Sequence, residues 1–324
     1  MKGTAPPSPA VDRLDIAIFR ELVQQRTTVP LSTDPLRSLR SIAKRLEVDK
    51  DTVRSRIQRL RRGGFLSAPF VFPNPRLLGM ALEQTWLDVR PGHKPALIDS
   101  LRADERVVVI SDHLGDSLTF AALTDPGSPA NTPHEALVQL PAVRGARSAP
   151  IPFPTSELLL TRLDWRIMQA LQSAERPSLG SLSRALRVSP RTAKRRLDRM
   201  IAGYALFVIP RFDPKALDGS VADFAVFYGP DAHKAKVDRQ VMGSLSDCLF
   251  HADLGDPGHS FFNFIVNSVA KGRAAVAWVG STPGVHEARL DFVVERIELL
   301  SHMEMLLHSR SPMPPARSTH RGGS

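Results

Sequence analysis

The 324-residue sequence has almost no cysteine and no long hydrophobic stretch. Cys248 is its single cysteine, which excludes an internal disulfide framework and favours a reducing compartment. No apolar run approaches the roughly 20 residues that a membrane-spanning helix needs. The opening residues, MKGTAPPSPAVDR, have no apolar core, so we expect no secretory signal peptide. These absences predict a cytoplasmic protein with no membrane partner.

Basic residues outnumber acidic residues in the sequence. The chain has 43 Lys and Arg against 33 Asp and Glu, a formal net charge of +10, which favours an anionic partner such as nucleic acid. Hydrophobic residues make up 42% of the chain, as in a globular protein. Because the length exceeds what one hydrophobic core usually serves, we expect two or more domains.

Residues 181–203 have the pattern of two short helices joined by a tight turn, because their apolar residues recur at helical spacing except at 187–189. Ser189 is predicted to cap the second helix, Pro190 suits its first position, and Gly203 can end it. The second helix carries the basic residues Arg191, Lys194, Arg195, Arg196 and Arg199 against one acid, Asp198. This pattern is typical of a helix-turn-helix, whose second helix lies between two walls of DNA phosphates.

The same pattern occurs 140 residues earlier, in residues 38–65. Matching pairs include Ala43 and Ser183, Val48 and Val188, Thr52 and Thr192, Gly63 and Gly203, and the triplets Leu114-Gly115-Asp116 and Leu254-Gly255-Asp256. We therefore interpret the chain as two tandem copies of one unit of about 150 residues.

After each helix-turn-helix, hydrophobic periodicity predicts the order β-α-β-β-α-β. The expected elements are 80–89, 95–101, 107–112, 118–123, 132–140 and 147–153 in the first copy, and 221–228, 235–245, 248–253, 261–266, 274–279 and 288–297 in the second. This order forms a ferredoxin-like antiparallel sheet with two helices on one face. The predicted fold class is α+β: a tandem repeat of a (winged) helix-turn-helix domain followed by a ferredoxin-like domain.

The predicted domains follow from these patterns. They are a disordered tail 1–12, helix-turn-helix domain 13–67, ferredoxin-like domain 68–154, second helix-turn-helix domain 155–207, second ferredoxin-like domain 208–309 and disordered tail 310–324. Both tails are rich in Pro, Ser, Gly and Arg and have little to bury.

This order of parts resembles the Lrp/AsnC (feast/famine) family of transcriptional regulators. The matching residues are Leu163-Asp164, Ser189-x-x-Thr192, Arg196-Leu197, Gly203-Tyr204, Leu254-Gly255-Asp256 and Pro283-Gly284-Val285. The resemblance implies a sequence-specific DNA-binding regulator that self-associates through its ferredoxin-like domains as a homodimer or larger assembly. It also implies modulation by an amino acid or related small molecule. Two departures are the fused pair of copies and Asp49, which replaces the expected Ser and is expected to cap well.

The predicted DNA contacts are the side chains that point away from the apolar face of each second helix. They are Lys50, Arg54, Ser55 and Gln58 in the first copy and Arg191, Thr192, Lys194 and Arg195 in the second. A solvated basic face is the alternative. Arg56 and Arg196 flank the apolar side, so bracing of the helix bundle is an alternative role for them.

The resemblance places effector contacts at Gly115, Asp116, Gly255 and Asp256 in the hairpins, with simple turn formation as the alternative. A metal site at Cys248 and His251 is disfavoured, because residues three apart on a strand point to opposite faces. We expect no metal and no cofactor.

An enzyme is the main alternative, because sirohaem decarboxylases resemble the same two-domain architecture, sometimes as fused pairs. Those enzymes carry an H-N-Y-x-R-like run that is absent from VVVISDHLGDSLTF and CLFHADLGDPGHSFF here. We therefore predict a nucleoid-associated protein that is not an enzyme. A DNA-organising or assembly protein without an effector stays open as a further alternative.

Overall fold

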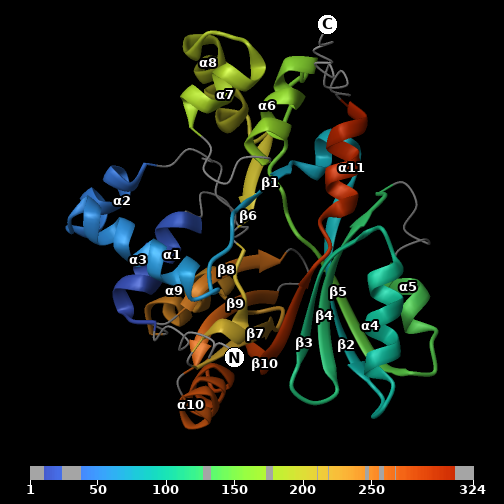
Figure 1. The fold of residues 1–324 in the computed structure, drawn as a ribbon. Helices are drawn as coiled ribbons and strands as arrows, with labels where there is room; N and C mark the ends of the chain where they lie inside the picture. Colours follow the sequence, from blue (N-terminus) through green and yellow to red (C-terminus); the bar gives the residue numbers. More distant parts are fainter. Residues whose placement is uncertain are drawn as a thin grey trace, which may run out of the picture.

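The computed structural model describes residues 11–23, 38–126, 133–172, 178–209, 211–217, 219–244, 248–254, 259–266 and 268–310. Its first helical unit contains α1 (Arg13–Val23), α2 (Leu39–Leu46) and α3 (Lys50–Arg62), and its second contains α6 (Arg162–Gln172), α7 (Leu179–Leu186) and α8 (Pro190–Ala202). Figure 1 shows the two units as separate groups of helices, the first at the left and the second at the top of the view. The predicted α+β class with antiparallel pairing is confirmed.

The sheet has eight strands in the order β5-β2-β4-β3-β10-β7-β9-β8, and every neighbouring pair is antiparallel. One half consists of β2 (Ala81–Val89), β3 (Val107–His113), β4 (Ser117–Thr124) and β5 (Val143–Pro150). The other half consists of β7 (Ser220–Tyr228), β8 (Cys248–Leu254), β9 (His259–Val266) and β10 (Val285–Glu298). The halves join where β10 pairs with β3, with Ile297 opposite Ile110.

Each half-sheet carries its helices on one face (Figure 1). They are α4 (Lys94–Ala103) and α5 (Pro133–Val138) for the first half, and α9 (Lys234–Ser244) and α10 (Val269–Gly280) for the second. Alternation explains this placement: Phe224 and Val226 on β7 pack towards the helices, whereas Ala225 between them points to the opposite face.

The two faces without helices pack against each other. The ring of Trp86 on β2 lies edge-on to His259 on β9, with 4.9 Å between ring centroids, and also contacts Phe227 and Phe261. Polar contacts cross the same interface, including Arg289 Nη2 to Asp88 Oδ1 at 2.8 Å. The sheet therefore curves until its halves form a common core.

A buried polar network lies at this interface. His113 Nε2 is 3.0 Å from Asp223 Oδ2, and Asn263 Nδ2 donates to Asp223 Oδ1 at 2.8 Å. The Ser117 hydroxyl is 3.3 Å from His113 Nδ1 and donates to Asp291 at 2.9 Å. These hydrogen bonds link β3, β4, β7, β9 and β10, although the buried Asn263 Oδ1 has no hydrogen-bond partner among the described residues.

The two helical units pack on different parts of the structure. Phe19 of α1 and Phe65 after α3 share a core with Phe212, Val221 and Ile265 of the second half. The second unit instead packs on strand β1 (Phe70–Pro73) through Val71 and on the C-terminal helix through Leu307. The first helix-turn-helix is thus held by the second half of the sheet, and the second by the segments around β1 and by the C-terminal helix.

Several elements differ from the sequence-based expectation. A two-stranded ribbon of β1 (Phe70–Pro73) and β6 (Leu206–Ile209) connects the halves, and short 3-10 helices follow these strands at Pro75–Leu78 and Pro214–Ala216. Helix α11 (Ser301–Arg310) lies beyond the last predicted element, and its Leu307 carbonyl accepts from Gln169 Nε2 of α6 at 2.7 Å. Helix α10 begins five residues earlier than predicted, strand β5 four and strand β10 three. Across the described parts of the chain, none of the helices has the length and apolar character needed to cross a membrane.

Candidate nucleic-acid interface

The second helical unit has the local geometry that its sequence predicts. The Ser189 hydroxyl accepts the Thr192 N–H at 3.1 Å, Pro190 opens α8, and Gly203 follows its last turn. Arg187 adopts a left-handed conformation with φ of 55° in the turn between α7 and α8. The predicted cap and turn are confirmed, and the turn orients α8 across α7.

The first unit has the same turn but a different cap. Glu47 takes the left-handed conformation with φ of 55°, and the Ser38 hydroxyl caps α2. Asp49 precedes α3, but its carboxylate makes no hydrogen bond to the first turn of that helix. The expectation that Asp49 caps α3 through its side chain is therefore wrong, and its charge stays outside the helix.

A buried aspartate ties α8 to α6. The Asp164 side chain is 0% exposed, and its Oδ2 lies 2.7 Å from Arg199 Nη2 and 3.2 Å from Arg196 Nη1. The backbone N–H and the hydroxyl of Thr161 both donate to the same oxygen at 2.8 Å. These bonds leave Arg196 facing the helix bundle, so it braces the unit.

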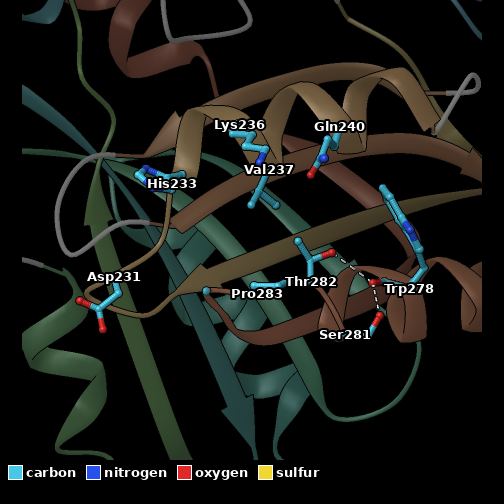
Figure 2. Close-up of a pocket in the computed structure, with 10 residues that line it drawn as sticks. Asp231, His233, Lys236, Val237, Gln240, Trp278, Ser281, Thr282 and Pro283 are labelled. Atoms are coloured by element: carbon cyan, nitrogen blue, oxygen red, sulfur yellow. Dashed lines mark hydrogen bonds between the residues drawn. The ribbon is translucent and has the colours of Figure 1, made fainter.

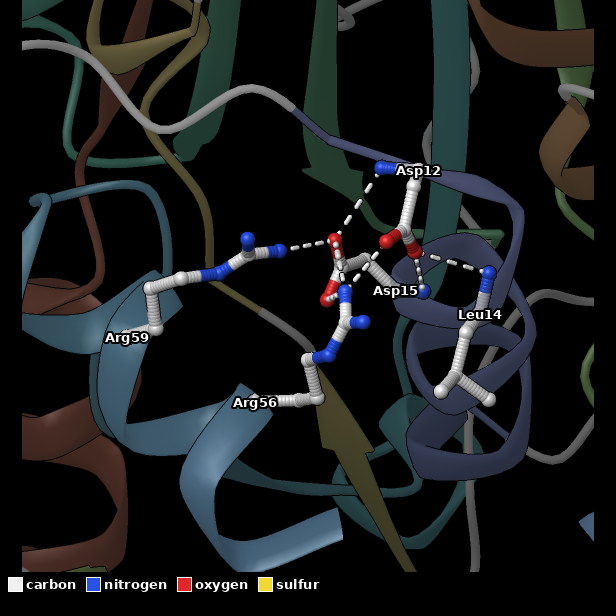
Figure 3. A network of polar contacts seen from close by, with 5 residues as sticks. All are labelled: Asp12, Leu14, Asp15, Arg56 and Arg59. Atoms are coloured by element: carbon white, nitrogen blue, oxygen red, sulfur yellow. Dashed lines mark hydrogen bonds and ion pairs between the residues drawn. The ribbon is translucent and has the colours of Figure 1, made fainter. Parts of the chain in front are cut away.

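The first unit repeats this arrangement (Figure 3). Asp15, whose side chain is also 0% exposed, pairs with Arg59 and, at 3.4 Å, with Arg56. Asp12 adds a second carboxylate to Arg56. Burial opposes ionisation of Asp12, but hydrogen bonds from Arg56 and from the backbone of Asp15 hold the pKa of Asp12 below its ordinary value. Arg56 therefore braces α3 against α1.

Sequence reasoning missed both aspartates as structural residues. The available signal was an acid at a buried helical position: Asp164 stands beside Trp165 and three residues before Ile167, both of which are buried. A buried carboxylate needs a cationic partner, and the arginine pair three residues apart on α8 supplies two.

The predicted DNA-contacting residues lie on the outer sides of α3 and α8. The exposed ones are Lys50, Arg54, Ser55, Arg191, Lys194 and Arg195, whereas Gln58 and Thr192 are partly buried. Arg54 pairs with Asp51 at 2.6 Å, and Lys194 pairs with Asp198 at 2.6 Å. Within the described residues, Arg191 and Arg195 have no ion-pair partner.

The first hairpin is held by the protein itself. Lys94 Nζ donates to the Gly115 carbonyl at 2.5 Å and lies 2.7 Å from Asp112 Oδ1. Asp116 lies 3.5 Å from Arg144. Gly255 and Asp256 lie outside the described residues, as do the side chains of Cys248 and His251. Across the described part of the chain, no three His, Cys, Asp or Glu side chains form a metal-binding group.

Figure 2 shows a cavity of about 580 Å³ between α9 and the end of α10. Its lining includes Asp231, His233, Lys236, Gln240, Trp278 and Thr282. None of the described residues predicted to contact DNA or an effector lines it, whereas Pro283 and Gly284, which are part of the resemblance, do. The cavity lies on the helix-covered side of the second half, whereas the basic faces belong to the helical units.

The sequence profile of the winged helix-turn-helix DNA-binding family matches residues 160–203, which span α6, α7 and α8. A DNA-binding type of helix-turn-helix in this segment is thereby confirmed. No curated protein matches the sequence.

Among solved structures, the siroheme decarboxylase NirDL is 13% identical and superposes with a TM-score of 0.55 over 91% of this chain and 98% of its own. NirDL in complex with an iron-uroporphyrin III analogue is 14% identical, with a TM-score of 0.52 over 92% and 98%. LrpC of B. subtilis is 15% identical, with a TM-score of 0.35 over 44% and 99%.

The decarboxylase structures correct one expectation. The sequence led us to predict that the chain is not an enzyme, chiefly because an H-N-Y-x-R-like run is missing. The fold that covers nine tenths of the chain is the fold of an enzyme, so that prediction is wrong. A missing short motif is a weak ground for excluding a whole class of proteins that share an architecture.

Proposed function

We propose that this chain binds double-stranded DNA as a transcriptional regulator. The observation that carries the proposal is the exposed basic face of α8, in a segment that matches a winged helix-turn-helix DNA-binding family. Arg191 and Arg195 on this face are free of ion pairs within the described structure. Arginine side chains contact phosphates and can also read guanine edges through two parallel hydrogen bonds.

Wild-type protein is expected to bind a mixed-sequence duplex of about 30 base pairs, three helical turns long. With three or four phosphate contacts, the logarithm of the affinity should fall against the logarithm of salt concentration with a slope of about −3. Fluorescence anisotropy between about 50 and 200 mM salt measures this slope. Absence of binding at the lowest salt concentration would refute the proposal.

The resemblance noted in the sequence extends the proposal. In it, the chain is a fused pair of Lrp/AsnC-type units with the domain bounds predicted above, and it binds specific operators. The repeated order of strands in the two half-sheets supports the fused pair. We also propose self-association through the ferredoxin-like halves and an effector at the hairpins. At Gly115 and Asp116, an effector would replace contacts from Lys94 and Arg144.

A second candidate function is an enzyme that acts on a tetrapyrrole, and it follows from the whole-chain likeness in fold to siroheme decarboxylase NirDL. If it is correct, sirohaem added to the purified protein should shift its main absorption band, and mass spectrometry should detect product that has lost carboxyl groups. An unchanged spectrum at excess protein would reject this candidate, whatever the DNA titration shows.

A further inference from the structure

We propose that the two second helices are unequal: α8 binds DNA and α3 does not, so each chain brings one DNA-contacting helix. This inference rests on the proposed function and deepens it, because it says which of the predicted contact residues bind DNA. The N-terminal half of such a helix is the part that reaches the bases, and the two helices differ most there.

The first two turns of the two helices differ in net charge. Residues 189–195 contain three basic residues and no acid, whereas residues 49–55 contain two acids, Asp49 and Asp51, against two bases. The Asp51 side chain is 82% exposed, so its negative charge would face the DNA backbone if α3 bound DNA. A phosphate is therefore attracted to the start of α8 more strongly than to the start of α3, where the acids cancel the bases.

Ion pairs within the helices increase this difference. Asp51 Oδ1 lies 2.6 Å from Arg54 Nη1. This ion pair occupies one of the two basic side chains in the first turns of α3. On α8 the corresponding acid, Asp198, comes later and engages only Lys194. Arg191 and Arg195 are four residues apart on one exposed face, and the described structure gives neither an acidic partner.

The residues that precede the two helices also favour DNA binding by α8 over α3. Ser189 satisfies the Thr192 N–H with a neutral hydroxyl, so the positive end of the α8 dipole is free to face a phosphate. At α3 this end already faces two carboxylates, because Asp49 lies directly before the helix and Asp51 in its first turn. A phosphate at α3 would have to approach both of them.

The two units share the bracing of the second helix and the turn before it, so the difference that matters for DNA lies in the first turns of α3 and α8. Each unit has a buried aspartate that holds two arginines of its second helix, and each has a left-handed residue in the turn. The first unit is thus built as a helix-turn-helix, but the acids at the start of α3 make that end of the helix unsuited to DNA. A two-fold symmetric DNA site would require α8 from a second copy of the chain.

The test compares two double variants that each remove two exposed positive charges from the full-length chain. Arg191→Ala/Arg195→Ala should weaken binding to the mixed-sequence duplex at least about 10-fold and reduce the salt slope by about 2. Lys50→Ala/Arg54→Ala should change the affinity less than about 2-fold. Anisotropy gives both quantities, and circular dichroism melts check that both variants fold.

The outcomes separate the two levels of the proposal. If wild-type protein binds no DNA, the proposed function fails. If wild-type protein binds and the α3 variant loses as much affinity as the α8 variant, or neither loses any, the inequality is overturned. A further experiment adds Asp49→Ser/Asp51→Ala to the Arg191→Ala/Arg195→Ala variant. The affinity for DNA should then rise several-fold above that of the α8 variant. Unchanged affinity would overturn the role of the two acids.

Discussion

Asp164→Asn should lower the free energy of unfolding by about 3 kcal/mol, because it removes the charge that two arginines share in a buried position. The carboxylate is 0% exposed and also accepts both hydrogen bonds of Thr161 at the start of α6. Arg196 and Arg199 retain some access to water, which places the effect at the lower end of what breaking a buried ion pair costs.

Asp198→Asn is the matched control on α8 itself. Asp198 is 56% exposed and pairs with Lys194 one turn away, so its loss should change stability by less than about 0.5 kcal/mol. Urea denaturation followed by far-ultraviolet circular dichroism measures both variants. Equal effects for the two substitutions would show that Asp164 does not hold α8 to α6.

Trp86→Ala should destabilise the protein by about 4 kcal/mol, because it empties the centre of the interface between the two half-sheets. The Trp86 side chain is buried and contacts His259, Phe227 and Phe261 of the opposite half. Its removal leaves a cavity in a core formed by both halves, so we expect both to unfold at lower urea concentration.

Trp278→Ala provides the comparison for that variant. Trp278 is 40% exposed at the rim of the cavity beside α10, and its loss should cost less than about 1 kcal/mol. The same denaturation experiment compares the two tryptophans directly. A small effect at Trp86 would mean that the halves are stable without packing on each other.

Local elements were predictable because neighbouring residues in the sequence determine them. The Ser189 cap, the turn before it and the end of α8 at Gly203 depend on backbone hydrogen bonds within a few residues. The alternation of apolar residues likewise placed β7 and β9 to within two residues at either end. Basic residues on the outer side of α8 followed from the same helical spacing.

Asp49 shows where local reasoning fails. Aspartate is a good capping residue on average, but its side chain makes no cap hydrogen bond here. Which rotamer it adopts depends on the surrounding charges, and three-dimensional placement decides those. The role of Arg56 was open in the sequence for the same reason, because its partner Asp15 lies 41 residues earlier.

The sequence alone determined the β-α-β-β-α-β order of each half-sheet, the helix-turn-helix geometry and the positive face of α8, since each follows from periodicity, capping and charge within short segments. Only the tertiary structure decided that β3 pairs with β10, that β1 pairs with β6, that the first helical unit packs on the second half-sheet, and that the second packs on β1 and α11. The physical reason is that apolar faces of similar size can be buried in several pairings. Shape and contacts between distant residues, such as Trp86 with His259, select one of them.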